Sequence, residues 1–226
     1  MVLAADAQRG TVGLMDNRAV SIESKGPKLE GLLHLPNATP APGIVVCHPH
    51  PMYGGDMHNN VVDAVCQTAV ENGIAALRFN FRGTGDSEGK YDNGIGERDD
   101  VRAALTYLRG LPELDSGRVA LAGYSFGAAV SLHATDEQLD AFIAVSLPTA
   151  MALKDVRVAC PALFVSGDHD EYSDANELTR LVGGLGPQAE LKLLPGLGHF
   201  WFGVERDLKA ILEPFLRAHV SAVASA

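Results

Sequence analysis

Cysteine is scarce in this chain of 226 residues. The three present, Cys47, Cys66 and Cys160, are odd in number, lie in apolar surroundings and lack a C-x-x-C spacing. Such a set does not provide a disulfide framework or a cysteine-based zinc site. We therefore expect reduced core thiols and a cytoplasmic location.

Long apolar runs are also missing. Nowhere do 18 apolar residues follow one another, and residues 1–11 lack the charged-then-apolar pattern of a secretion signal. Basic residues are few, since 18 Lys and Arg stand against 28 Asp and Glu and give a net charge of −10. This charge opposes binding to nucleic acid or anionic lipid. We expect no nucleic-acid partner, no membrane association and a small substrate that is neutral or has an uncharged head group.

Apolar residues make up 46% of the chain, enough for a core that needs neither disulfides nor metal. No composition break, linker or low-complexity tract divides the sequence. We predict a single domain over residues 1–226, with residues 1–18 as an N-terminal extension. The sequence leaves the oligomeric state open, with a homodimer as one possibility.

Strand and helix patterns alternate along the chain. The expected strands are 19–24, 28–35, 43–48, 74–81, 118–124, 141–147, 161–166 and 190–194, and the expected helices are 57–71, 97–109, a helix after residue 125, 174–182 and 201–215. Asp56 is the expected N-cap of the first helix, and Pro214 should kink or end the last. The first two strands read as an antiparallel hairpin and the rest as right-handed βαβ crossovers, which predicts an α/β fold with a mostly parallel sheet and helices on both faces.

The sequence Gly123-Tyr-Ser-Phe-Gly127 joins a predicted buried strand to a predicted helix. In a sharp turn of this kind the serine has a strained backbone, and only glycines at its two ends leave room for neighbouring atoms. Ser125 Oγ would stand above the sheet edge, with the N–H of Phe126 as one donor of an oxyanion hole. The same pattern also occurs as a plain turn, so the interpretation depends on partners elsewhere.

Such partners follow in the chain order that this motif requires, nucleophile, acid and then base. His199 lies in a glycine-rich loop between the last predicted strand and helix, where it can reach the sheet edge as a base. The acid should follow the strand 161–166, where Asp168, Asp170, Glu171 and Asp174 are candidates. Asp168 lies close to the strand end and Asp174 resembles a helix cap, so we favour Asp170.

The loop after strand 43–48 contains His48, His50, Asp56 and His58, which raises the alternative of a metal site. Asp56 follows the second histidine by six residues, and two prolines stiffen the approach, so we predict no metal and no cofactor. A backbone N–H of this loop is the better candidate for the second oxyanion donor. His50 leads, with Met52 or Tyr53 as alternatives, because Pro51 has no N–H.

A nearby loop, Arg82-Gly-Thr-Gly-Asp-Ser87, also follows a predicted strand. We expect Arg82 and Asp86 to pin this loop by hydrogen bonds and ion pairs, without a catalytic role.

Taken in order, Gly-Tyr-Ser-Phe-Gly, Gly-Asp-His-Asp and Gly-His-Phe resemble the motifs of the α/β-hydrolase superfamily over residues 19–218. The segments His48-Pro-His-Pro-Met-Tyr-Gly-Gly55 and Asn80-Phe-Arg-Gly-Thr-Gly-Asp-Ser-Glu-Gly89 look like a narrower group, small bacterial hydrolases related to the dienelactone-hydrolase and carboxylesterase branch. The resemblance implies the α/β-hydrolase fold and the triad Ser125, Asp170 and His199. Dienelactone hydrolases carry cysteine where this chain has Ser125. The superfamily also includes acyltransferases and peptidases.

We therefore predict a serine hydrolase acting on a small-molecule ester. Acyl transfer or peptidase chemistry on the same triad is an alternative, and a metal-dependent hydrolase or a non-catalytic ligand-binding protein are others. The connection 147–161 is too short for a cap domain, so the site should be open, with Tyr53, Met151 and Trp201 as pocket residues and Leu153 beside Met151. An open site favours short acyl chains of about two to six carbons, because further methylenes stay in water.

Overall fold

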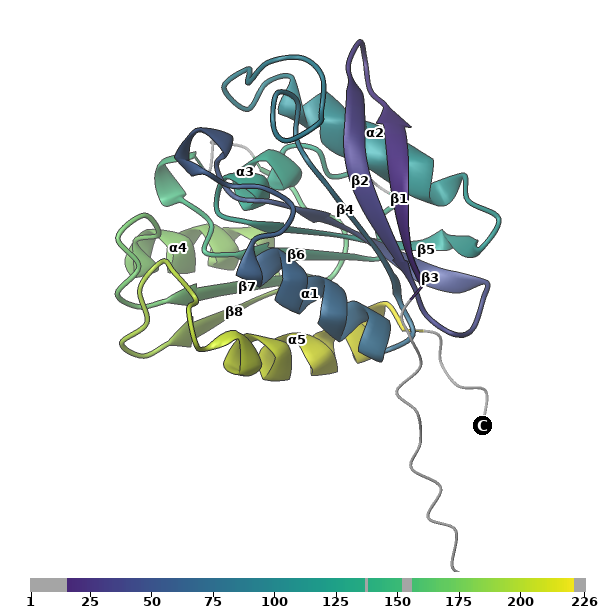
Figure 1. The fold of residues 1–226 in the computed structure, drawn as a ribbon. Coiled ribbons are helices and arrows are strands. Elements are labelled where there is room, and N and C mark those ends of the chain that lie inside the picture. Colours follow the sequence, from purple (N-terminus) through teal and green to yellow (C-terminus); the bar gives the residue numbers. More distant parts are fainter. Residues whose placement is uncertain (1–15, 137, 152–155, 222–226) are drawn as a thin grey trace, which may run out of the picture.

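The computed structural model describes residues 16–136, 138–151 and 156–221. One sheet of eight strands crosses the molecule in the order β1-β2-β4-β3-β5-β6-β7-β8 (Figure 1). Its strands are β1 (Asp16–Glu23), β2 (Lys28–Leu35), β3 (Ala41–Cys47), β4 (Ala75–Phe79), β5 (Leu114–Tyr124), β6 (Ala141–Val145), β7 (Ala162–Gly167) and β8 (Ala189–Leu194). The helices are α1 (Asn60–Glu71), α2 (Glu97–Arg109), α3 (Phe126–Leu132), α4 (Ala175–Leu185) and α5 (Glu205–His219), with short 3-10 turns η1 (Pro51–Tyr53) and η2 (Thr149–Met151).

Strand direction divides the sheet into two parts. β1 pairs antiparallel with β2, which pairs antiparallel with β4, whereas all pairs from β4 to β8 are parallel. The carboxyl ends of the parallel strands therefore meet at one edge, where ligands bind in sheets of this type. The predicted α/β fold with an N-terminal hairpin and a mostly parallel sheet is confirmed.

Two apolar cores lie on opposite faces of the sheet. Helices α1 and α5 cover one face, with buried residues such as Val61 and Leu212, and α2, α3 and α4 cover the other, with Leu105 and Leu178 (Figure 1). The central strands β3 and β5 contribute alternate side chains to both cores, as expected for strands buried on both faces. All three cysteines are free and buried, as predicted.

Several boundaries differ from the sequence expectation by a few residues, including the start of α5 at Glu205 instead of residue 201, and three of the differences are explained by specific contacts. β1 begins at Asp16, so residues 16–18 of the predicted extension pair with β2. Asp56 does not cap α1: its carboxylate accepts the N–H of His58 at 2.7 Å, and Asn59 caps the helix by accepting the N–H of Val61 at 2.9 Å. Pro214 does not end α5, which continues to His219. Pro214 is on the exposed side, where water can satisfy the freed carbonyl, while the buried Phe215 and Leu216 hold the last turns.

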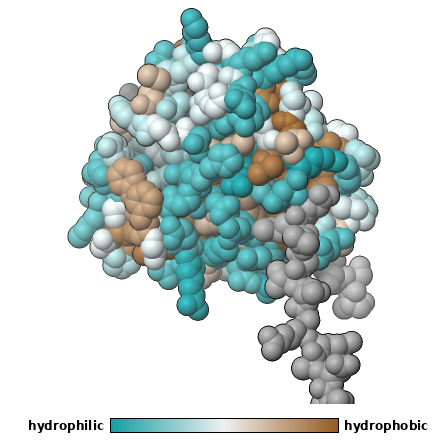
Figure 2. Space-filling model, viewed as in Figure 1, coloured by the Kyte–Doolittle hydropathy of each residue, from teal (hydrophilic) through white to brown (hydrophobic). Residues whose placement is uncertain are grey.

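The connection between β6 and β7 is short, and its described residues contain only the 3-10 turn η2. Leu153 lies outside the described residues. On the face shown in Figure 2, hydrophobic side chains form scattered patches among hydrophilic ones. None of the helices in the described part of the chain has the length and apolar character needed to cross a membrane.

Candidate active site

Ser125 lies at the turn between β5 and α3, in a backbone conformation that residues other than glycine seldom adopt. Its φ is 54° and its ψ −121°, and it is one of three non-glycine residues with positive φ in the described chain. A Cβ at Gly123 would lie 2.4 Å from the Gly127 carbonyl oxygen, and one at Gly127 would lie 2.4 Å from the His48 carbonyl oxygen. The two glycines are therefore required, as predicted, by contact of the turn with itself and with the end of β3.

His199 joins Ser125 to Asp170 through both ring nitrogens. His199 Nε2 lies 2.9 Å from Ser125 Oγ, and His199 Nδ1 lies 2.8 Å and 3.0 Å from the two carboxylate oxygens of Asp170. Because the carboxylate can only accept, the imidazole proton is on Nδ1, and Nε2 is free to accept the hydroxyl proton. All three side chains are buried. The arrangement can activate a serine hydroxyl as a nucleophile.

The Asp170 carboxylate is held by several donors besides the histidine. Oδ1 accepts the N–H groups of Tyr172 at 3.0 Å and Ser173 at 3.1 Å, and Oδ2 accepts the hydroxyl of Ser166 at 3.2 Å. Burial by itself raises the pKa of Asp170, but the hydrogen bond from His199, the charge that its ring carries when protonated, and the N–H of Tyr172 lower it more. The pKa is thus below its ordinary value, and the carboxylate stays ionised.

The other acids considered for this role lie elsewhere. Asp168 accepts the N–H of Gly196 at 2.6 Å, and Asp174 caps α4 by accepting the N–H groups of Asn176 and Glu177. Glu171 is exposed and receives only a long contact of 3.4 Å from the His199 N–H. The structure therefore brings Asp170, and not these three, to the imidazole.

The loops that carry Asp170 and His199 are in direct backbone contact. Leu197 accepts the N–H of His169 at 3.0 Å, and Leu194 accepts that of Asp168 at 3.1 Å. A Cβ at Gly167 would lie 1.8 Å from the Leu197 carbonyl oxygen, so no other residue fits there without displacing the backbone. The two loops form one unit at the sheet edge.

The loop after β3 lies beside Ser125 and contains the predicted second oxyanion donor. The N–H of Met52 donates to His50 Nδ1 at 3.2 Å, and that of Tyr53 to the His50 carbonyl at 3.1 Å. Among the described residues, the N–H of His50 has no acceptor. Phe126 begins α3, so its N–H has no partner within the helix. Of the three alternatives in this loop, His50 is thus the one whose N–H is available.

His48, one of the residues considered as a metal ligand, has both ring nitrogens engaged. Nδ1 donates to the Pro49 carbonyl at 2.7 Å, and Nε2 accepts the N–H of Phe81 at 3.0 Å. No group of three or more His, Cys, Asp or Glu in the described residues is placed to hold a metal ion. His48 instead ties the end of β3 to the segment after β4.

We expect the stability of the protein to fall as the pH drops from 6.5 to about 4, partly because of His48. Burial is the main cause that lowers the pKa of this imidazole from 6.5 to about 4. The unfolded chain binds the proton at higher pH than the folded one, so this stabilisation is complete above pH 6.5 and lost on acidification. The full effect is about 3 kcal/mol. His34, whose pKa is also lowered to about 4 by burial, acts in the same direction.

Urea unfolding at a series of pH values would measure this slope. His48→Gln should be less stable at pH 7 but lose less free energy of unfolding between pH 6.5 and 4. His58→Gln, on an exposed side chain nearby, is the matched control and should keep the wild-type slope. Equal slopes for the wild type and His48→Gln would contradict the assignment.

A cleft of about 1020 Å³ opens above Ser125 and is lined by Tyr53, Met151, Tyr172 and Phe202 among others. Tyr53 and Phe202 are 87% and 75% exposed, so they stand at the rim and do not cover the cleft. Trp201 was predicted in the pocket, and this is wrong. Its side chain is 1% exposed, belongs to the core beside α5, and donates from Nε1 to Ser146 Oγ at 3.1 Å.

Sequence reasoning missed residues that surround the histidine. The Tyr124 hydroxyl donates to the His199 carbonyl at 3.0 Å, and its ring stacks on the imidazole at 5.6 Å between centroids. The ring of Tyr172 meets the imidazole at 4.7 Å. The position of Tyr124 beside Ser125 in the motif was a usable signal. Ser166 and Tyr172 have no comparable pattern.

Comparison with known proteins places this chain in a family. The X-Pro dipeptidyl-peptidase (S15) family matches residues 25–156, more than half of the chain and including Ser125. The chain belongs to this family. Its fold and family make it a hydrolase of the α/β serine hydrolase type, which confirms the superfamily predicted from sequence.

Three relatives show the extent of the similarity. A structure from Coxiella burnetii, described as an alpha-beta serine hydrolase homologue, is 32% identical with a TM-score of 0.82 and covers 90% of this chain and 99% of its own. One from Xanthomonas campestris, described as an a/b serine hydrolase without lid, is 30% identical with a TM-score of 0.84 and covers 95% and 100%. An uncharacterized protein of Rickettsia prowazekii is 35% identical over 81% of this chain and 82% of its own. In the described residues of this chain, the connection between β6 and β7 likewise contains only η2.

Proposed function

We propose that this protein hydrolyses carboxylic esters through Ser125, His199 and Asp170 and an acyl-enzyme. The observation that carries the proposal is the unbroken hydrogen-bond chain from Ser125 Oγ through both nitrogens of His199 to the Asp170 carboxylate. That chain supplies a nucleophile, a base of fixed tautomer and an anion that stabilises the imidazolium.

In the first half of the reaction, Ser125 Oγ attacks the ester carbonyl while its proton passes to His199 Nε2. The N–H groups of Phe126 and His50 hold the resulting oxyanion. The tetrahedral intermediate then collapses, the bond to the alcohol oxygen breaks, and the imidazolium gives its proton to that oxygen. In the second half His199 takes a proton from water, whose oxygen attacks the acyl-enzyme, and Ser125 recovers its proton as the acid leaves.

Cleavage of X-Pro peptides is the second candidate, because it is the activity for which the matching family is described. The match ends at residue 156, before Asp170 and His199, so it does not extend over the whole site. Support for ester hydrolysis comes from the cleft itself. A cap that encloses the end of a peptide would have to be inserted between β6 and β7. The described residues of this connection contain only η2, whose Met151 lines one side of the cleft.

We expect p-nitrophenyl acetate and butyrate to be hydrolysed with higher kcat/KM than the decanoate and palmitate. Beyond about six acyl carbons, added methylenes would extend past the rim and forfeit most of the ~0.8 kcal/mol each that burial provides. Gly-Pro-p-nitroanilide should be cleaved far more slowly than any short ester. Initial rates over both series, with one enzyme preparation, measure these differences.

Each outcome has a separate meaning. Specificity constants that climb steadily from butyrate to palmitate would contradict the open site but leave the ester assignment standing. Faster cleavage of Gly-Pro-p-nitroanilide than of p-nitrophenyl acetate would favour the peptidase. Loss of ester hydrolysis with a chelator would point instead to a metal-dependent reaction.

A further inference from the structure

The His50 side chain has a partner from a distant part of the chain. Tyr91, in the loop before α2, places its hydroxyl 3.1 Å from His50 Nε2. His50 Nδ1 accepts the N–H of Met52, so the ring proton is on Nε2 and donates to the Tyr91 oxygen. The imidazole is thereby fixed at both ends, by its own 3-10 turn and by Tyr91.

The same side chains connect the two residues proposed to hold the oxyanion. The His50 ring lies 4.8 Å from that of Phe126 and 5.2 Å from that of Tyr91, and the Tyr91 and Phe126 rings are 5.8 Å apart. The N–H group of His50 belongs to the loop after β3, and that of Phe126 to the first residue of α3. Contact through this ring cluster sets the position of the loop relative to the helix.

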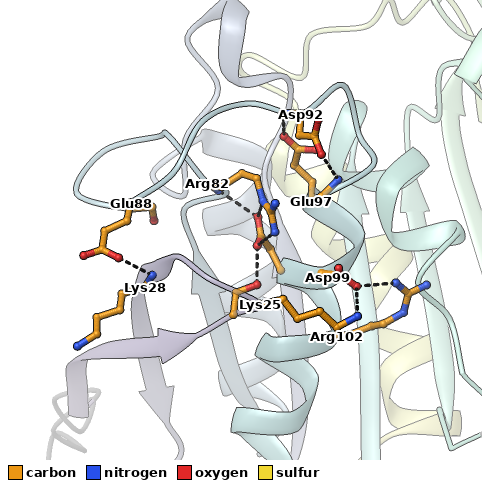
Figure 3. Close-up of polar contacts among 12 residues, drawn as sticks. Lys25, Lys28, Arg82, Glu88, Asp92, Glu97, Asp99 and Arg102 are labelled. Carbon is orange, nitrogen blue, oxygen red and sulfur yellow. Dashed lines mark hydrogen bonds and ion pairs between the residues drawn. The ribbon is translucent and has the colours of Figure 1, made fainter.

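The loop that carries Tyr91 is itself anchored by a buried carboxylate. Glu97 is fully buried, and its oxygens accept the N–H groups of Asp92 at 2.7 Å and Gly94 at 2.9 Å. Figure 3 shows Glu97 pointing back toward the Asp92 segment, at the first turn of α2. A Cβ at Gly94 would already contact the Phe126 ring at 3.6 Å, so this segment lies against the cluster.

A second anchor joins α2 to the segment after β4. Arg82 forms a two-pronged pair with the buried Asp100, whose carboxylate oxygens lie 2.9 Å from Nε and 2.7 Å from Nη2, and the hydroxyl of Ser24 donates to the same carboxylate at 2.8 Å. Arg82 therefore pins its segment to α2, and not only its own loop as expected from sequence. Asp86 uses its backbone N–H, which donates to Glu30 at 2.9 Å. Both anchors stabilise the position of the segment from which Tyr91 contacts His50.

We propose that Tyr91 is a positioning residue for the oxyanion hole, acting through the His50 side chain. Tyr91 is not among the residues that line the cleft, and its hydroxyl is bonded to the residue whose N–H is the available donor. The proposal rests on the ester hydrolysis proposed above. It deepens that function by assigning the loop 88–96 a part in transition-state stabilisation.

Tyr91→Phe tests the proposal, because it removes the hydroxyl and keeps the ring. We expect kcat for p-nitrophenyl butyrate to fall about tenfold with KM unchanged. Loss of an entire oxyanion donor lowers kcat by about 10²–10³-fold, whereas here the donor is only displaced. A trifluoromethyl ketone that forms an oxyanion adduct should bind about tenfold more weakly, whereas the melting temperature should stay the same. Tyr107→Phe, on a half-buried tyrosine of α2 with no described hydrogen bond from its hydroxyl, is the matched control.

A double-mutant cycle separates this role from a general structural one. His50→Gln keeps the backbone N–H at position 50, and Tyr91→Phe added to it should cause no further loss if the tyrosine acts through the imidazole. Additive losses, or a Tyr91→Phe enzyme with wild-type kcat and ketone affinity, would overturn the proposal. If the wild type itself neither hydrolyses esters nor binds the ketone, the proposed function has failed, and the inference with it.

Discussion

Replacement of Ser125 by alanine should lower kcat/KM for p-nitrophenyl butyrate by about 10⁴–10⁶, because loss of the nucleophile removes the contribution of the whole triad. The fold should remain intact, since alanine accepts the same surroundings without new contacts at Gly123 or Gly127. The side chain is only 8% exposed, and its Oγ is bonded to His199 Nε2.

The measurement combines rates with covalent labelling. A fluorophosphonate should add once per chain at Ser125 in the wild type, and fail to add to Ser125→Ala or His199→Ala. Ser21→Ala, at an exposed position of β1, is the matched control and should behave as the wild type. Folded Ser125→Ala protein with undiminished hydrolysis would refute the mechanism, and an unlabelled wild type would favour a binding protein.

Asp170→Asn should lower kcat by about 10³ or more while the protein stays folded. The amide oxygen would take the place of Oδ1, which accepts the N–H groups of Tyr172 and Ser173, and would leave the NH₂ group 3.0 Å from His199 Nδ1. The NH₂ group of the asparagine and the Nδ1–H group of His199 would then both be donors and could not bond to each other. No anion would stabilise the imidazolium. Steady-state rates together with circular dichroism would measure the effect.

Asp168→Asn is the informative comparison, because Asp168 was the nearest rival in the sequence. It accepts the N–H of Gly196 in the loop that leads to the histidine, so its loss should reduce kcat by less than tenfold. If Asp168→Asn were the more damaging of the two, the acid would be assigned to the wrong residue.

Chain order and strand ends were enough to predict the fold and to select Ser125, Asp170 and His199, which the structure brings within hydrogen-bond distance. In a parallel sheet, residues that directly follow strands must meet at one edge, so sequence position translates into proximity. Asp170 could be distinguished from Asp168 because two more residues let the chain turn back over the sheet.

The incorrect or missed predictions concern side chains whose direction is fixed neither by a hydrophobic period nor by the end of a strand. Trp201 follows His199 in an irregular loop, so nothing in the pattern shows whether it faces the cleft or the core. The contact of Tyr91 with His50 joins two loops 41 residues apart and has no sequence signature. The cap of α1 was misplaced because Asp56 and Asn59 both precede the helix and either side chain could serve.

The contact between Gly167 and Leu197 has a thermodynamic consequence for turnover. The loops of Asp170 and His199 are joined by backbone hydrogen bonds that form when the protein folds, so the ordering entropy of this pair is lost once, before any substrate arrives. In the proposed mechanism, substrate binding then need not immobilise Asp170 relative to His199. Tyr53, on the exposed rim of the cleft, belongs to neither loop, so its side chain can adjust to substrates of different shape without disturbing the tautomer of the histidine.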